Sequence, residues 1–214
     1  MGIKAVVFDF WGTLVSTGTY SPMRQTHQLL APGLEFSEFV QRFETAFMTK
    51  EYKDQAEAFS VCCEEFGVQP RNFMISRLIG IWNKNKILAT IFPDTIETLE
   101  SLKKKGLKIG VMSNTDCFGM ELLFDRLELK KFTDVVHFSF ETGMLKTDVA
   151  AMDAMLGALG VTKAEAVVVG DSVESDMAGA QAAGMKGILV DRRNKREFSP
   201  KIADLRELVG LLEA

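Results

Sequence analysis

Polar side chains that could do chemistry stand at or just beyond the ends of the short apolar runs in this sequence. In a doubly wound sheet, ligands collect beyond the carboxyl ends of the strands. A single acid, serine or asparagine at such a place usually caps a helix or makes a turn. Several of them at one end of one sheet instead predict a shared site. These residues are Asp9, Ser113, Asn114, Lys146, Asp171, Ser172 and Asp176.

Three of these residues are carboxylates, and together they favour a metal ion. Asp9, Asp171 and Asp176 would repel one another strongly if they were crowded together. A hard divalent cation with oxygen ligands removes that repulsion, and Mg²⁺ fits this donor set. The Lys146 ammonium and the Ser113 hydroxyl could then hold a dianion such as a phosphoryl group. Loop amides after the first strand would add donors. The remaining substrate-binding residues are expected to be Gly12, Thr13, Asn114 and Ser172.

The elements that must position these residues alternate between strand and helix patterns. Each predicted strand is a short and mostly apolar run, which is typical of strands buried on both faces of a parallel sheet. The repeated alternation predicts an α/β fold with a doubly wound parallel sheet and right-handed crossovers. The predicted strands are Ala5–Phe10, Lys108–Met112, Val135–Phe138, Ala166–Val169 and Gly187–Val190.

Helix signals separate these strands. Asp94 and Glu97 have the spacing of a capping box, and Gly106 follows the helix that they would begin. Near the end of the chain, Ser199 is expected to cap a helix that has Pro200 in its first turn.

Residues 17–89 have a different texture, because they contain helical repeats and no convincing strand pattern. Phe36, Val40, Phe43 and Phe47 recur at helical spacing, and a similar stripe follows over residues 52–63. Such stripes are more typical of a helical core than of a cofactor site. We therefore predict a helical cap at 17–89, inserted into a Rossmann-like core formed by 1–16 and 90–214.

Composition limits the classes of partner. The chain of 214 residues is 47% apolar and 25% charged, with a formal net charge of −4. That balance is ordinary for a globular protein and argues against a nucleic-acid surface. No apolar run reaches the roughly 18 residues of a membrane span, so no membrane partner is expected. Three cysteines without metal-type spacing, and no signal-peptide pattern, predict a cytoplasmic protein. A monomer and a dimer both remain open.

Four segments in this order resemble a known set of motifs. "DFWGTL", "SN", "K" and "GDSVESD" are similar to motifs I to IV of the haloacid dehalogenase superfamily, most of whose members are phosphatases. The resemblance covers nearly the whole chain, including a C1-type helical cap between motifs I and II. It implies that Asp9 attacks phosphorus and forms an aspartyl-phosphate, with Ser113 and Lys146 binding the transferred group. It also implies that Asp171 binds Mg²⁺ and that Asp176 supports the site from behind.

The sequence departs from the family at one important position. Most family phosphatases have a second aspartate two residues after the nucleophile, and it protonates the leaving oxygen and then activates water. Here that residue is Trp11, whose backbone carbonyl could still bind Mg²⁺ but whose indole cannot exchange protons at neutral pH. General acid–base help is worth about 10² to 10⁴ in rate, so its loss should matter most for alkyl phosphates. The indole could instead wall the pocket or press on the cap.

Three functions follow from this pattern. The first is a Mg²⁺-dependent hydrolase of small phosphorylated molecules with a modified proton path. The second is a 2-haloacid dehalogenase, in which Asp9 would attack carbon without a metal; the retained Asp171 and Asp176 argue against it. The third is a weakly active binding or regulatory protein. A substitute acid could come from the cap, where the sequence does not choose among Tyr20, His27, Glu51 and Asp54.

Overall fold

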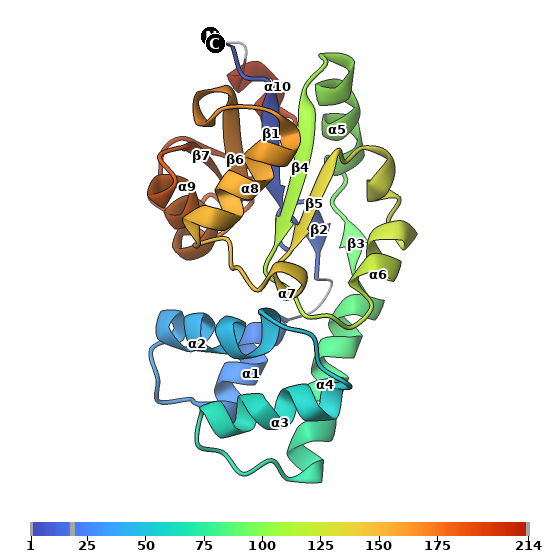
Figure 1. The fold of residues 1–214 in the computed structure, drawn as a ribbon, viewed down its shortest axis with the longest axis vertical. Coiled ribbons are helices and arrows are strands. Elements are labelled where there is room, and N and C mark those ends of the chain that lie inside the picture. Colours follow the sequence, from blue (N-terminus) through green and yellow to red (C-terminus); the bar gives the residue numbers. More distant parts are fainter. Residues whose placement is uncertain (1, 18–19, 213–214) are drawn as a thin grey trace.

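A parallel sheet forms the larger part of the molecule (Figure 1). The computed structural model describes residues 2–17 and 20–212, and the sheet has the strand order β5-β4-β1-β6-β7-β8. Neighbouring strands pair in parallel, with Asp9 opposite Met112 at the end of β1. This confirms the predicted α/β fold. The strands are β1 (Ala5–Asp9), β4 (Lys108–Ser113), β5 (Val135–Phe138), β6 (Ala166–Gly170), β7 (Lys186–Val190) and β8 (Lys201–Ile202).

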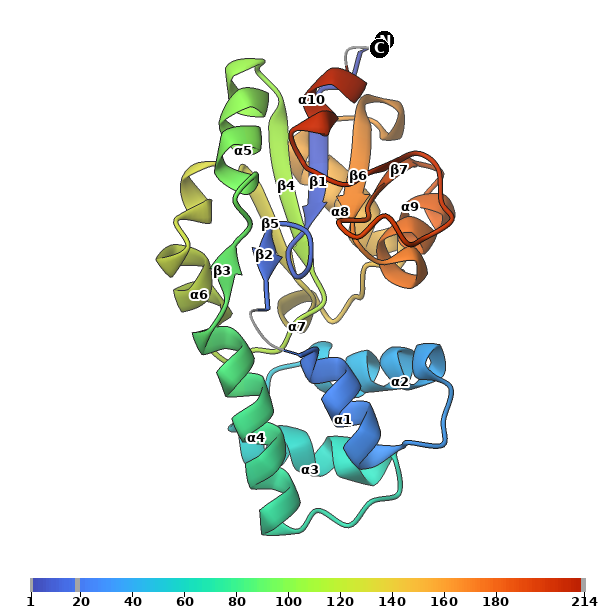
Figure 2. The ribbon, with the colours of Figure 1, turned by 180° about the vertical axis from the view of Figure 1, so that it is seen from behind.

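Helices cover both faces of this sheet. α8 and α9 pack on one face, while α5, α6 and α10 pack on the other, which faces the viewer in Figure 2. Side chains of β1 alternate between the two cores, with Val7 on one side and Phe8 on the other. The flanking helices are α5 (Thr95–Lys104), α6 (Met120–Arg126), α7 (Ser139–Thr142), α8 (Val149–Leu159), α9 (Ala178–Ala182) and α10 (Glu207–Leu211), with short turns at Leu129–Lys131, Lys163–Glu165 and Val173–Met177.

A helical unit is inserted between β1 and β4, as predicted. It begins and ends at a small antiparallel pair in which Val15 of β2 (Val15–Ser16) lies opposite Ile91 of β3 (Thr90–Ile91). The helices enclose their own aromatic core, which includes Phe43, Phe47 and Trp82. The predicted domain limits, 1–16 and 90–214 against 17–89, stay a prediction. The helices are α1 (Pro22–Leu30), α2 (Phe36–Met48), α3 (Gln55–Glu65) and α4 (Asn72–Ile87).

Two helix-start predictions were wrong in detail. Ser199 and Pro200 precede strand β8, and α10 begins only at Glu207, because residues 201–202 extend the sheet beside β7. Asp94 does start α5, but its carboxylate makes no cap bond. It accepts two bonds from the Arg192 guanidinium, at 2.7 and 3.1 Å, and one from the Leu205 amide at 2.8 Å. A tertiary ion pair therefore replaces the expected capping box.

Within residues 2–17 and 20–212, every helix is too short or too polar to cross a membrane.

Candidate active site

The carboxyl ends of the three central strands bring the predicted residues together. Asp9 is the last residue of β1, Ser113 is the last residue of β4, and Asp171 follows β6 directly. β1 lies between the other two strands, so the three side chains converge at one edge of the sheet. The apolar runs form parallel strands, and parallel pairing places their carboxyl ends, and therefore these three side chains, side by side.

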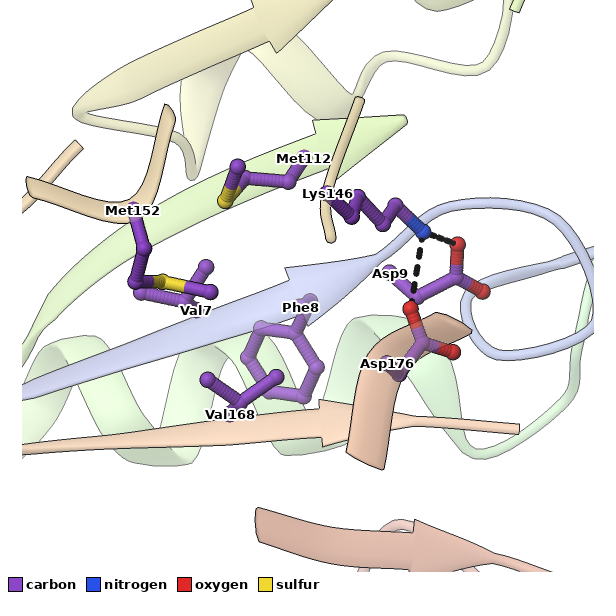
Figure 3. A pocket seen from close by; sticks show the side chains of 8 residues that line it. All are labelled: Val7, Phe8, Asp9, Met112, Lys146, Met152, Val168 and Asp176. Carbon is purple, nitrogen blue, oxygen red and sulfur yellow. Dashed lines mark hydrogen bonds and ion pairs between the residues drawn. The ribbon is translucent and has the colours of Figure 1, made fainter. Parts of the chain in front are cut away.

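The Lys146 side chain contacts two of the acids, Asp9 and Asp176 (Figure 3). It lies in the segment between α7 and α8, and its ammonium contacts Asp9 Oδ1 and lies 2.9 Å from Asp176 Oδ1. All three side chains are at least nine-tenths buried. A Cβ added to Gly179 would lie 2.4 Å from the Lys146 carbonyl oxygen, so only glycine lets this segment pack so closely on α9.

Asp171 is held against the loop that follows β1. Gly12 has φ +87°, and a Cβ placed on it would lie 2.4 Å from Asp171 Oδ2. Glycine at position 12 thus satisfies both the left-handed backbone and the close approach. The Asp171 carboxylate forms no hydrogen bond or ion pair with any of the described residues.

The electrostatics of the cluster are those of too many acids for one cation. Burial, and then repulsion from Asp9 and Asp176, raises the pKa of Asp171 to about 8. Burial also raises the pKa of Asp9, to about 6, against the attraction of Lys146. Burial alone would lower the pKa of Lys146, but Asp176 and Asp9 together raise it above its usual value. The lysine is therefore a permanent cation that leaves excess negative charge beside it.

The donor set fits a hard divalent cation. One carboxylate oxygen from each of Asp9, Asp171 and Asp176 lies within 4.8 Å of the other two. Asp9 Oδ2 is buried and has no hydrogen-bond partner among the described residues. Both oxygens of Asp176 are engaged, one by Lys146 and the other by the Ser172 amide at 3.0 Å. Asp9 and Asp171 thus have the free oxygens, and Asp176 holds the cluster in place.

The other predicted substrate-binding residues lie around this cluster. The Ser113 hydroxyl is fully buried and makes no hydrogen bond within the described chain. Thr13 is buried, and its carbonyl accepts from Arg192 at 2.8 Å. The Ser172 hydroxyl accepts from the Ser175 amide at 3.1 Å and so caps the turn that follows. Their roles toward a substrate stay predictions, as does that of Asn114.

A comparison with protein families decides the identity of the fold. The family described as haloacid dehalogenase-like hydrolases matches residues 3–184. The chain belongs to this family.

Relatives of this hydrolase include enzymes named for two different reactions. A glyceraldehyde 3-phosphate phosphatase from Methanothermobacter thermautotrophicus is 28% identical over 194 residues, covering 88% of this chain and 86% of that protein. The (S)-2-haloacid dehalogenase 1 of Pseudomonas sp. is 26% identical over 228 residues, covering 98% and 96%. A HAD phosphatase from Thermococcus onnurineus has the same fold, with a TM-score of 0.66 at 24% identity and 98% coverage of both chains.

Trp11 stands two residues after Asp9, where its side chain offers no acid. The indole is partly buried, packs against the core of the sheet and meets the Phe10 ring edge-to-face, with 4.9 Å between centroids. The indole therefore contributes to the structure through apolar packing. Ligation of a metal ion by its carbonyl stays a prediction.

Sequence reasoning missed one acid at the site. Glu44, on α2 of the helical unit, accepts a 2.8 Å hydrogen bond from the Asn114 amide group. The side-chain oxygen of Asn114, Oδ1, in turn accepts a hydrogen bond from the Lys146 backbone amide at 3.0 Å. The available signal was a charged residue between Val40 and Met48, four positions from each on the apolar side of an amphipathic helix.

Proposed function

We propose that this hydrolase is a Mg²⁺-dependent phosphatase of small phosphorylated molecules and that it acts through an aspartyl-phosphate on Asp9. The observation that carries the proposal is the cluster of Asp9, Asp171 and Asp176, whose oxygens approach within 4.8 Å beside a buried Lys146. A dehalogenase has no need for three acids at one point. In a phosphatase, a carboxylate must approach an anionic phosphate, which requires a cation to offset the charge. The additional acids would hold that cation.

Each residue of the cluster has a role that its position supports. The free Asp9 Oδ2 attacks phosphorus, because its other oxygen is held by Lys146. The Lys146 ammonium neutralises charge on the transferred phosphoryl group, and the buried Ser113 hydroxyl donates to one of its oxygens. The amides around Gly12 and Thr13 donate to the others.

Asp171, the Trp11 carbonyl and the Asp9 oxygen that does not attack phosphorus would hold the magnesium ion, while Asp176 would orient Lys146 and the Ser172 loop. When bound, Mg²⁺ supplies positive charge that lets a carboxylate approach a phosphate dianion. The phosphatase names among the relatives support a phosphorylated small molecule as the substrate class.

A metal-dependent substrate screen tests this proposal. With Mg²⁺, we expect phosphate release from p-nitrophenyl phosphate, acetyl phosphate and small alkyl phosphates. Asp9→Asn or a chelator should abolish it, because the first removes the nucleophile and the second the counter-charge. Wild-type protein that releases no phosphate from any of them would refute the proposal.

A 2-haloacid dehalogenase is the second candidate, and two observations favour it. Trp11 supplies bulk where a phosphatase usually has an acid, and a 26% identical relative over nearly the whole chain is a dehalogenase. The same screen includes chloroacetate. Halide release that survives the chelator would establish this alternative, and no turnover on either panel would favour a binding protein.

A further inference from the structure

A carboxylate from the helical unit reaches the site at the end of β4. α2 lies along the side of that unit nearest the sheet in both views (Figures 1 and 2). Glu44 lies on α2, and its Oε2 accepts a 2.8 Å hydrogen bond from the side-chain amide of Asn114. Asn114 directly follows Ser113 and also binds the backbone amide of Lys146. Glu44 is therefore one hydrogen bond from the residues proposed to hold the phosphoryl group.

We propose that Glu44 is the general acid and base that position 11 lacks, an inference that rests on the phosphatase function proposed above. Its carboxyl group would protonate the leaving oxygen and later take a proton from water. Because it comes from the inserted helices, proton transfer would be available only when that unit lies on the sheet.

The electrostatic environment of Glu44 suits this task. Burial raises its pKa to about 7, against the Asn114 hydrogen bond and the attraction of Lys146, while Asp176 and Asp9 add repulsion. A proton-transfer group works best with a pKa near the working pH. Such a carboxyl group is protonated in part of the molecules at neutral pH, and it gives and accepts protons readily.

The cap residues considered from the sequence are placed less well. His27 bonds the Leu34 carbonyl at 2.8 Å within the helical unit, and Asp54 caps α3 through the Glu57 amide at 2.9 Å. Tyr20 is 60% exposed and lines a cavity of that unit beside Arg77. Glu51 is also exposed. Glu44, by contrast, is bonded to Asn114, which directly follows β4, the strand paired with the β1 strand that carries Asp9.

The proposed steps balance in atoms and charge. Asp9 Oδ2 forms a bond to phosphorus as the bond from phosphorus to the alkoxy oxygen breaks, and that oxygen takes the proton of Glu44. The resulting Glu44 carboxylate then takes a proton from water. The water oxygen bonds phosphorus, the Asp9–phosphorus bond breaks, and inorganic phosphate leaves with Asp9 ionised and Glu44 protonated again.

Glu44→Gln tests the assignment because the amide keeps the bond from Asn114 and cannot exchange a proton. With Mg²⁺, we expect kcat/KM for alkyl phosphates to fall by about 10² to 10⁴. For acetyl phosphate and p-nitrophenyl phosphate, whose leaving groups depart unprotonated, formation of the aspartyl-phosphate should continue. Its hydrolysis should slow, which gives a burst of p-nitrophenol. Glu38→Gln, on the exposed side of the same helix, is the control.

The outcomes separate this inference from the function on which it rests. An equal loss on every substrate with no burst would make Glu44 a positioning residue, and unchanged kinetics would exclude any role; either result overturns the inference alone. An inactive wild-type protein overturns both. If Glu44→Gln does not fold by circular dichroism, Glu44→Ala is used with formate. Rescue of alkyl phosphate turnover by formate supports the inference, and failure of rescue in the folded variant refutes it.

Discussion

At the residue scale, the candidate site is a set of buried charges that the backbone holds at short range. Lys146 is shared by Asp9 and Asp176, while Asp171 is left with Gly12 as its neighbour. Removing one partner from a buried charged set costs more free energy than the set contributes to stability. Substitutions here should therefore affect function and folding together, so each test needs a control.

Gly12→Ala should disturb the cluster without replacing any of its charged side chains. The alanine Cβ would lie 2.4 Å from Asp171 Oδ2 at φ +87°, so both the loop and the carboxylate must move. We expect the free energy of unfolding to fall by about 1–3 kcal/mol and Mg²⁺ binding by calorimetry to weaken. The matched control is Gly33→Ala, where a Cβ meets nothing within 4 Å. Unchanged Mg²⁺ affinity in Gly12→Ala would contradict the proposed site.

Glu44 should leave a signature in the pH dependence of stability. Its pKa is about 7 in the folded chain and 4.5 ordinarily, so the folded state holds the proton more tightly. The stabilisation is complete below about pH 4.5 and is lost as the pH rises through 7. When a chelator is present, the free energy of unfolding of Glu44→Gln should rise by up to about 3 kcal/mol relative to that of wild type between pH 4.5 and 8. Parallel urea-unfolding profiles for the two proteins would show that Glu44 titrates normally.

At the element scale, polar contacts from α2 and from the end of α4 fix the helical unit to the part of the molecule that contains the sheet. Glu44 of α2 bonds Asn114, and Ser139 Oγ donates to the Met48 carbonyl at the end of α2 at 2.6 Å. At the end of α4, Lys86 contacts the Asp116 carboxylate and the Phe118 carbonyl. These contacts join the segments after β4 and β5 to the inserted helices, so they set how α2 lies over the site.

Lys86→Met tests the contact at the end of α4. The Asp116 side chain is 1% exposed, so losing its cation leaves a buried charge unpaired. We expect the free energy of unfolding to fall by about 3–5 kcal/mol in denaturant titrations. Lys84→Met removes a lysine exposed on the same helix and should change it by less than about 0.5 kcal/mol. Equal effects of the two substitutions would mean that the Lys86 contact adds nothing.

At the scale of the whole molecule, the sequence predicts the sheet and the inserted helices better than it predicts their contacts. The five apolar runs become β1, β4, β5, β6 and β7 because strands buried on both faces need continuous apolar residues. The pairs β2–β3 and β7–β8 are not predicted from the sequence, because two paired residues are too few to show the alternating pattern of a strand. The positive φ of Gly106, directly after α5, agrees with the helix end that the sequence predicts there.

The site shows the same division. Asp9 and Ser113 end their strands and Asp171 follows one, so the sheet topology brings the three together and the sequence predicts them. Glu44 reaches the site across 70 positions through Asn114, and no local pattern encodes that contact. Asp94 is a similar case, because its partner Arg192 lies 98 positions away and replaces the local cap.

The most direct test of the central claim is to trap the phosphoryl group on Asp9. Wild-type protein is mixed with acetyl phosphate and Mg²⁺, quenched in acid, and its intact mass and peptides are measured. The account predicts one added phosphoryl group on the peptide containing Asp9, absent with chelator and absent in Asp9→Asn. No adduct at Asp9 while phosphate is released, or an ester at Asp9 after chloroacetate without metal, would contradict it.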